Sequence, residues 1–381
     1  MDVDLNADQK ILVQTVRRFC EEKVRPFARE WDKTSTFPHQ VVRELGQLGM
    51  LGILIDEKYG GAGLGYREFA LVCEEVGRYD GSLGLTVASH NGLGSGHLAT
   101  FGSESQKQKF LPKLARGEIL GAWALTEPGS GSDSAGMRTT AIRHGNGWRL
   151  NGAKMFITQG TVCGCVVVLA VTQKEKKHHG ITAFLLEPGK KGFLQKSLHD
   201  KLGMRASDTA ELVFENVELT DADMLGNEGQ GFANTMAILD RGRISLAALG
   251  CGMIRGSLEE SLKYAKQREA FGKPISDFQA IQWKLANMAT EYHAARLLTW
   301  RAASLADQGV PFSKEASMAK LFASEAAMRA TSEAVQIHGG YGYTQEFPVE
   351  RYLRDAKLLE IGEGTSEVQR MVIARHLLNS M

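Results

Sequence analysis

Cys165-Val-Val-Val-Leu-Ala170 and Ile181-Thr-Ala-Phe-Leu-Leu186 are the two apolar runs that decide the fold class of this 381-residue chain. Two further short runs, Trp148–Gly152 and Ala210–Phe214, lie on either side of them. Turns rich in Gly, Asn, Asp and Pro join the four runs, and no long helical pattern intervenes. The pattern therefore predicts an antiparallel β domain, at residues 119–228, and argues against a doubly wound sheet.

Helical patterning lies on both sides of this β domain. Before it, apolar residues recur at helical spacing from Leu12 to Phe19 among polar positions. After residue 229, the long amphipathic segments Asp240–Arg268 and Phe278–Gln308 are typical of a helical bundle. We expect an α+β architecture with an N-terminal helical domain at residues 1–118, the middle β domain, and a C-terminal four-helix bundle at residues 229–381.

Charge and composition argue against several classes of function. Charged residues make up 23% of the chain and the net charge is +1, so we expect no surface for nucleic acid or for an acidic membrane. No apolar stretch approaches the length of a membrane span. No GxGxxG follows a strand-like run and opens a helix, so a Rossmann-type dinucleotide site has no support.

The cysteines and the N-terminus indicate a reducing compartment. The five cysteines are scattered and form no CxxC, so a disulfide framework is not expected. The acidic start, Met1–Asp4, does not resemble a signal or transit peptide. We therefore expect a bacterial cytoplasmic protein, with the mature form of a mitochondrial matrix protein as the alternative.

Two segments leave more than one interpretation open. Gly81–Gln106 contains no Lys or Arg, which is typical of buried core and, less often, of an apolar ligand tunnel. Lys174–His179 is typical of a solvated hairpin tip, and a His-pair metal site is the weaker alternative. We expect no bound metal.

A carboxylate between two glycines, Gly362-Glu363-Gly364, stands near the C-terminus. The flanking glycines allow unusual backbone angles. Ser366 and Gln369 fit a capping box for a helix that follows. Locally, the pattern is typical of a surface Glu at a helix N-terminus. A buried carboxylate with a raised pKa would instead suit proton abstraction next to a carbonyl.

Other segments could hold a polar cofactor. Thr126–Asp133 is a Gly- and Ser-rich loop whose N–H groups could face a phosphate or a ring carbonyl, although such loops are more often plain turns. Met155–Thr158 lies about one strand away and is otherwise an ordinary strand end. Arg268 could pair with a pyrophosphate. Taken alone, the segments Arg268–Ile275 and Gln336–Gly342 are helix ends with a glycine stop.

Six runs in this order resemble the acyl-CoA dehydrogenase family, of the short-, medium- or branched-chain type, over essentially the whole chain. They are Thr126–Asp133 (TEPGSGSD), Lys154–Thr158 (KMFIT), Lys201–Thr209 (KLGMRASDT), Arg268–Gln279 (REAFGKPISDFQ), Gln336–Tyr343 (QIHGGYGY) and Arg354–Arg370 (RDAKLLEIGEGTSEVQR). The resemblance implies an FAD-dependent acyl-CoA dehydrogenase that forms a trans-2-enoyl-CoA in fatty acid β-oxidation and passes electrons to an electron-transferring flavoprotein. It also implies a homotetramer, a dimer of dimers.

Glu363 matches the catalytic base of that family, which removes the α-proton while a hydride leaves the β-carbon for flavin N5. Because the base and the flavin face opposite sides of the substrate, the chemistry needs two distant motifs. In the family, the thioester oxygen is held by the main-chain N–H at the base and by a ribityl hydroxyl of FAD, which acidifies the α-carbon.

Further roles carry over by resemblance. The matches to FAD contacts within one subunit are Leu125, Thr126, Gly131, Ser132, Phe156, Thr158, Thr365 and Glu367, the last standing where the family often has Gln or Asn. The matches to residues that reach the FAD of a neighbouring subunit are Arg268, Phe271, Gln279, Gln336 and Gly340. The matches to acyl-CoA contacts are Ser132, Asp240, Arg243 and Gly364.

A few positions narrow the implied activity. Gly242 stands where some members carry the base, and glycine cannot act as one. Gly362 replaces an aromatic residue of several members, which leaves room for a bulkier or longer acyl group. Ser82 and Gly84 stand where members that decarboxylate dicarboxylyl-CoA use an Arg, so that activity is disfavoured. The alternatives to a dehydrogenase are an oxygen-using, acyl-CoA oxidase-like flavoenzyme and an inactive flavin-binding scaffold.

Overall fold

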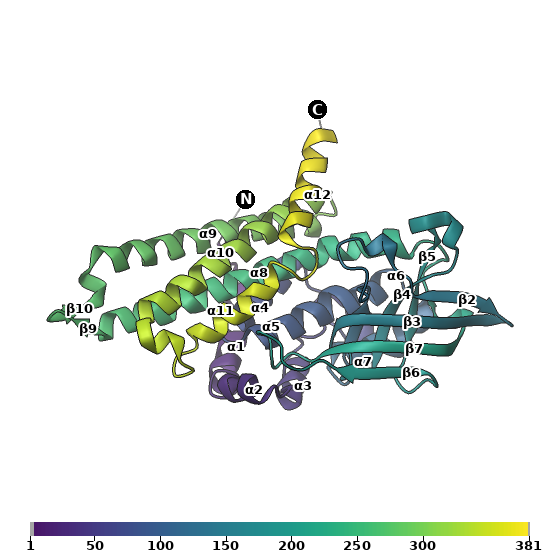
Figure 1. The fold of residues 1–381 in the computed structure, drawn as a ribbon, viewed down its shortest axis with the longest axis horizontal. Coiled ribbons are helices and arrows are strands. Elements are labelled where there is room, and N and C mark those ends of the chain that lie inside the picture. The colour runs from purple at the N-terminus through teal and green to yellow at the C-terminus, as the bar shows by residue number, and fades with distance from the viewer. Residues whose placement is uncertain (1–3, 380–381) are drawn as a thin grey trace.

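Helical, β and helical domains follow one another along the chain in this computed structural model, which describes residues 4–379 (Figure 1). Of the acidic start Met1–Asp4, residues 1–3 lie outside the described part. The predicted order of helices, sheet and helices is confirmed. Within residues 4–379, none of the helices combines the length and the apolar character that a membrane span needs.

A capping box starts the first helix of the N-terminal domain. The Gln9 N–H donates to Asn6 Oδ1 at 2.8 Å, and the Asn6 N–H donates to Gln9 Oε1 at 3.2 Å. The helices are α1 (Ala7–Lys23), α2 (Ala28–Thr34), α3 (His39–Gln47), α4 (Tyr66–Gly77), α5 (Gly81–Ser89), α6 (Gly96–Phe101) and α7 (Glu104–Ala115). A π-helical turn, η2 (His90–Ser95), joins α5 to α6. Every residue of α5 and η2 is buried, as the absence of Lys and Arg suggested.

The middle domain is a sheet in the strand order β6-β7-β3-β2-β4-β5-β8, with β1 paired to β4. The strands are β1 (Gly121–Ala124), β2 (Thr140–His144), β3 (Gly147–Thr158), β4 (Cys165–Val171), β5 (Ile181–Leu186), β6 (Phe193–Ser197), β7 (Thr209–Thr220) and β8 (Met224–Leu225). All four predicted runs are strands, and Lys174–His179 lies in the exposed link of the β4–β5 hairpin.

The sheet differs from a purely antiparallel one in two pairings. β1 runs parallel to β4 from Gly121 to Ala124, and β2 meets β4 in parallel at Thr140. A parallel pair needs a long connection, and residues 125–164, which include the β2–β3 hairpin, supply it. β4 and β5 are buried along nearly their whole length, as strands covered on both faces are.

Long helices make up the C-terminal domain: α8 (Gly231–Gln267), α9 (Gln279–Asp307), α10 (Ser313–His338), α11 (Val349–Leu359) and α12 (Ser366–Asn379). α10 packs against α8 and α9 through a row of buried alanines. α8 also packs closely on α4, because a Cβ on Gly252 would lie 2.2 Å from the Glu74 carbonyl oxygen. At this point the two helical domains approach so closely that only glycine fits.

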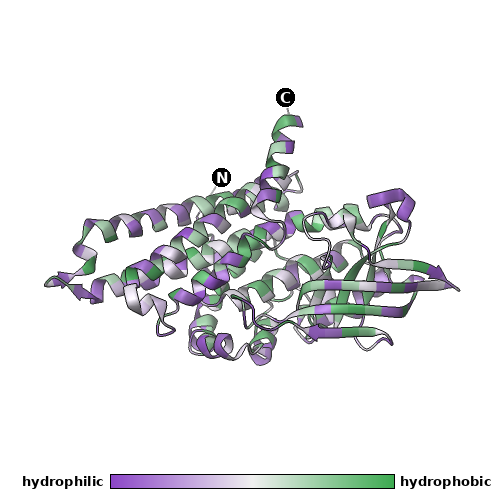
Figure 2. Ribbon diagram, in the orientation of Figure 1, coloured by the Kyte–Doolittle hydropathy of each residue, from purple (hydrophilic) through white to green (hydrophobic). Residues whose placement is uncertain are grey.

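Two features project from this body (Figure 1). A short ribbon, β9 (Glu269–Ala270) with β10 (Lys273–Pro274), links α8 to α9 at the end of the molecule opposite the sheet. α12 points away from the other helices, and Figure 2 shows apolar turns along it. Met371 is 62% exposed and Leu378 is 76% exposed there.

Candidate active site

Glu363 lies in the turn between α11 and α12 with a left-handed backbone. Its φ is 53°, which side chains other than glycine rarely adopt, and Gly364 follows with a φ of 93°. Several hydrogen bonds hold this turn. The Ser366 N–H donates to the Glu360 carbonyl at 3.0 Å, and Gln369 Nε2 and Lys320 Nζ donate to the Gly364 carbonyl at 2.8 and 2.7 Å.

The Glu363 carboxylate points inward, although the residue as a whole keeps some exposure. Its Oε2 is buried and has no hydrogen-bond partner within the described residues. A Cβ on Gly242 of α8 would lie only 2.0 Å from Oε2 and 3.1 Å from Leu93 Cδ2. The carboxylate therefore packs against the bare backbone of α8 at Gly242, which a surface Glu would not do.

Burial raises the pKa of Glu363 to about 7, and the nearby cations Lys320 and Arg243 oppose that rise. A carboxyl group that titrates near neutral pH can accept a proton from a weak acid. The raised pKa of Glu363 therefore suits a general base. Gly242, at which the resemblance places the base of some members, lies directly beside this carboxylate.

The predicted capping box of Ser366 and Gln369 is wrong. The N-cap of α12 is Thr365, whose Oγ1 accepts from the Val368 N–H at 3.3 Å. Gln369 instead turns its amide to the carbonyl of Gly364, and Ser366 Oγ is buried without a partner within residues 4–379. Glu367, in the first turn of the helix, is exposed.

The structure brings the two β-domain motifs together. The Met155 N–H donates to the Thr126 carbonyl at 2.9 Å, so the end of β3 lies beside the loop that follows β1. In that loop Leu125 is buried and Thr126 half-buried, whereas Gly131 and Ser132 are exposed. At the end of β3, Phe156 has a φ of 61° and is 67% exposed, and Thr158 is half-buried.

A buried ion pair that the sequence did not reveal fixes this loop. Lys154 Nζ lies 2.9 Å from Glu127 Oε1 and 2.9 Å from the Leu125 carbonyl, and the Lys154 side chain is 0% exposed. Glu127 also accepts from the N–H groups of Arg138 and Thr139. Burial lowers the pKa of Lys154 to about 8. The sequence signal that could have indicated this pair is a lysine at a strand position whose side chain points into the core.

Asp240 and Arg243 form a second polar group close to Glu363. Arg243 Nη1 lies 2.5 Å from Asp240 Oδ1 and 3.2 Å from Ser317 Oγ, and Arg243 is 5% exposed. Ser313 Oγ donates to Asp240 Oδ1 at 2.8 Å. Arg243 Nε is buried with no partner in residues 4–379, so the guanidinium has a donor to offer a ligand.

The residues matched to the FAD of a neighbouring subunit gather at the end of the molecule opposite the sheet. The Arg268 guanidinium lies 6.0 Å from the ring centroid of Tyr341. This contact joins the residue before the β9–β10 ribbon to the turn after α10. Phe271 is 96% exposed. Gln279, Gln336 and Gly340 are exposed as well. Within one chain this set lies at the far end from Thr126 and Phe156, because the ribbon and the sheet occupy opposite ends in Figure 1.

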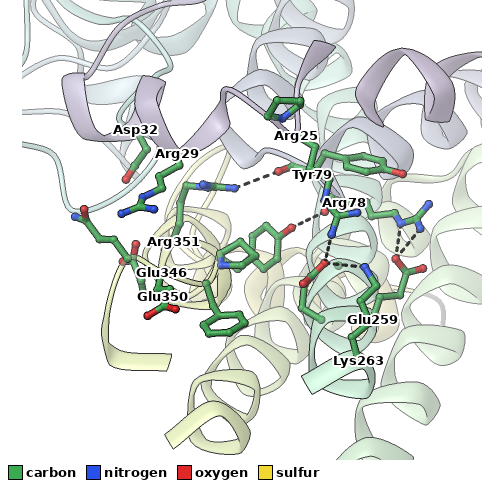
Figure 3. Close-up of a pocket in the computed structure, with 17 residues that line it drawn as sticks. Arg25, Arg29, Asp32, Arg78, Tyr79, Glu259, Lys263, Glu346, Glu350 and Arg351 are labelled. Atoms are coloured by element: carbon green, nitrogen blue, oxygen red, sulfur yellow. Dashed lines mark hydrogen bonds and ion pairs between the residues drawn. The ribbon is translucent and has the colours of Figure 1, made fainter. Parts of the chain in front are cut away.

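A charged cavity of about 260 Å³ lies apart from all of these residues (Figure 3). It opens between the α1–α2 junction, the end of α4, α8 and α11, and Arg78 and Arg351 are among its lining residues. Figure 3 shows Arg351 pointing to the Tyr79 carbonyl, to which it donates at 3.4 Å. None of the predicted site residues lines this cavity.

Comparison with known proteins agrees with the geometry. Models of the acyl-CoA dehydrogenase N-terminal, middle and C-terminal domains match residues 6–118, 122–217 and 229–378. A probable acyl-CoA dehydrogenase of Bacillus subtilis (strain 168) is 48% identical over 379 residues, which are 99% of this chain and 100% of the relative.

Solved structures extend the match to the fold. Butyryl-CoA dehydrogenase from Megasphaera elsdenii superposes with a TM-score of 0.97 and is 43% identical, covering 99% of this chain and 100% of that one. A chain from work on the electron transferring flavoprotein of Acidaminococcus fermentans superposes with a TM-score of 0.98 and 44% identity, with coverage of 99% and 100%. The chain described here belongs to the acyl-CoA dehydrogenase family, whose members are FAD-dependent oxidoreductases.

Proposed function

We propose that the protein dehydrogenates an acyl-CoA thioester to the trans-2-enoyl-CoA, with Glu363 as the base that removes the α-proton. The observation that carries this proposal is the buried Glu363 Oε2, which has no partner in residues 4–379 and lies against Gly242. A carboxylate with a pKa of about 7 is ionised in much of the protein at neutral pH. It can therefore accept the α-proton of a thioester whose carbonyl is polarised.

The turn that carries the base also serves the thioester. Because Glu363 and Gly364 both have a positive φ, their backbone N–H groups point in other directions than they would in a continuing helix. We assign the Glu363 N–H to the thioester oxygen, where a donor stabilises the negative charge that develops as the α-proton leaves. Gly364 lets the acyl-CoA approach the backbone closely.

The residues near β1 and β3 fit one part of FAD. Phe156 is an exposed aromatic ring beside the half-buried Thr126, and the Cβ position of Gly131 is open. We propose that Leu125, Thr126, Gly131, Ser132, Phe156 and Thr158 hold the flavin, with Thr365 and Glu367 near it. Bound FAD supplies the hydride acceptor and the route by which electrons leave.

The distal residues fit an anionic part of FAD. Arg268 is exposed, and the 29-residue helix α9 begins at Gln279 without a side-chain cap on its N-terminus. Because these residues lie far from Phe156 in one chain, we propose that they contact the FAD of a neighbouring subunit, together with Phe271, Gln336 and Gly340. A cofactor site of this kind needs at least two chains, and from the family resemblance we propose a homotetramer, a dimer of dimers.

The acyl-CoA is expected along α8. The unpartnered Nε of Arg243 and the carboxylate of Asp240 offer a donor and an acceptor on the turn of α8 that contacts the base at Gly242, and Ser132 offers a hydroxyl from the loop after β1. We propose that these three residues and Gly364 bind the thioester. A saturated, uncharged acyl chain fits best, because α5 carries no cation for a second carboxylate.

Electron transfer and location follow from the relatives. We propose that an electron-transferring flavoprotein takes the electrons, since the chain superposes on one from work on such a protein. A bacterial cytoplasm and a role in fatty acid β-oxidation suit the bacterial relatives and the sequence. Butyryl-CoA is the first substrate to test, because the chain superposes on a butyryl-CoA dehydrogenase with a TM-score of 0.97.

The test is anaerobic bleaching of the flavin absorbance by a panel of acyl-CoA thioesters. The panel runs from butyryl- to palmitoyl-CoA and includes isobutyryl-, isovaleryl-, cyclohexanecarboxyl- and glutaryl-CoA. We expect rapid bleaching by at least one uncharged member and none by glutaryl-CoA. No bleaching by any member, with FAD bound, would contradict the proposal and favour an inactive scaffold. Reoxidation by oxygen as fast as by the flavoprotein would favour an oxidase.

A further inference from the structure

Lys320 is a buried cation directed at the turn that carries Glu363. It lies on α10 and is 0% exposed, and its Nζ donates to the Gly364 carbonyl at 2.7 Å. Within residues 4–379 it forms no ion pair with a carboxylate at contact distance. Burying a charge without such a partner is unfavourable, and an apolar side chain of similar length would stabilise the core better. Its presence therefore points to a role other than stability.

The Gly364 carbonyl receives two donors of different kinds. Lys320 Nζ brings a positive charge from α10, whereas Gln369 Nε2 brings a neutral amide from α12 at 2.8 Å. Both side chains are 0% exposed. Together they hold a backbone that is left-handed at both Glu363 and Gly364. The hydrogen bond and the charge can therefore be separated by substituting one donor at a time.

The charge of Lys320 acts on the carboxylate of Glu363. Burial raises the pKa of Glu363, and Lys320 opposes the rise more than Arg243 does. Arg243 is paired with Asp240 at 2.5 Å, so part of its field is cancelled. Lys320 in turn faces Glu363, Arg243, Glu360 and Glu367, and burial lowers its own pKa to about 8. Below that pH it remains charged over the range in which Glu363 titrates.

We infer that Lys320 is a positioning residue of the active site, which holds the Gly364 carbonyl and keeps Glu363 ionised at neutral pH. The inference rests on the proposed role of Glu363 as the base. Without the ammonium, the Glu363 carboxylate would be less stabilised, and a larger share of the enzyme would carry it protonated and unable to accept the α-proton.

The experiment compares Lys320→Met with the matched control Gln369→Leu. Both remove a hydrogen bond to the Gly364 carbonyl, and Gln369→Leu also removes a longer one to the Glu363 carbonyl at 3.4 Å, but only Lys320→Met removes a charge. The pH dependence of kcat/KM reports the pKa of the base in the free enzyme. We expect Lys320→Met to move its acidic limb upward by about one pH unit or more. Gln369→Leu should lower the rate with the acidic limb unmoved.

Equal positions of the acidic limb in wild type and Lys320→Met would overturn the inference, whatever the loss of rate. FAD content and thermal unfolding serve as checks on folding. Should Lys320→Met fail to fold, Lys320→Gln restores a neutral donor and is expected to show the same upward shift. Glu363→Gln separates the two claims. If Glu363→Gln keeps its activity, the proposed function fails. If Glu363→Gln is inactive but the acidic limb of Lys320→Met matches that of the wild type, only the Lys320 inference fails.

Discussion

At the scale of single residues, Glu363 shows what a local pattern can and cannot indicate. Two flanking glycines predicted unusual backbone angles, and both Glu363 and Gly364 have positive φ. The local pattern favoured a surface Glu, whereas the carboxylate lies buried against Gly242, a residue 121 positions earlier in the chain. Burial of this kind depends on packing between distant segments, and only the family resemblance could indicate it.

Gly242→Ala tests the space around the base. The new Cβ would lie 2.0 Å from Glu363 Oε2, so the carboxylate must move. We expect kcat/KM to fall about 100-fold, since a shift of about 1 Å in a reacting group can cost that much. FAD content should be unchanged. Full activity in Gly242→Ala would show that the carboxylate does not react from this position.

The pH dependence of wild-type turnover tests the pKa of the base. Burial raises the pKa of Glu363 to about 7, and only the ionised form accepts a proton. We expect kcat/KM to be highest above neutral pH and to fall about tenfold for each unit below pH 7. Steady-state rates with butyryl-CoA between pH 5.5 and pH 9 measure this. A kcat/KM that stays flat down to pH 5.5, as expected for the ordinary Glu pKa of about 4.3, would argue against the buried carboxylate.

At the scale of elements, strand patterning was informative where the runs were long and apolar. β4 and β5 carry β-branched and aromatic residues along their length, which strongly favours strands. β1 was not recognised, because Gly-Ala-Trp-Ala is short and rich in small residues with low strand preference. Its parallel pairing with β4 depends on a connection of 40 residues (125–164), which no local pattern encodes.

Lys154→Met tests the buried Lys154–Glu127 ion pair, which fixes the loop Thr126–Asp133 that we propose to bind the flavin. Removing Lys154 leaves the buried Glu127 carboxylate without its cation, which typically costs about 3–5 kcal/mol of stability. We expect a lower unfolding temperature and weaker FAD retention, measured by thermal denaturation and flavin absorbance. The control is Lys109→Met, which breaks the Lys109–Glu187 pair whose side chains are 55% and 49% exposed. That substitution should change the stability by less than about 1 kcal/mol. Equal effects of the two would contradict the role given to Lys154.

At the scale of the whole molecule, the residues matched to FAD within one subunit and those matched to the FAD of a neighbouring subunit lie far apart in one chain. Thr126 and Phe156 lie at the sheet, and Arg268 lies by the β9–β10 ribbon at the other end (Figure 1). The family resemblance predicted both groups and assigned them to different subunits, and the lengths of α8, α9 and α10 account for their separation within one chain. Exposed apolar side chains at Phe271, Trp283 and Leu378 indicate surfaces that another subunit could cover.

Arg268→Ala tests the shared cofactor site. Loss of a charge-assisted contact to an anionic part of FAD should weaken FAD binding about tenfold or more. If the site spans two subunits, FAD loss and dissociation of the tetramer should occur together on dilution. Light scattering combined with flavin absorbance measures both. Lys266→Ala removes a neighbouring exposed charge from α8 and should retain FAD. Unchanged FAD content in Arg268→Ala would remove this residue from the site.

The most direct test of the account compares wild type and Glu363→Gln in a single anaerobic turnover. Flavin absorbance is followed after mixing with the acyl-CoA that bleaches the wild type fastest. We predict that Glu363→Gln folds, retains FAD and binds the thioester but bleaches about 1,000-fold more slowly, as expected when a general base is lost. Bleaching of the variant at nearly the wild-type rate would show that Glu363 does not remove the α-proton.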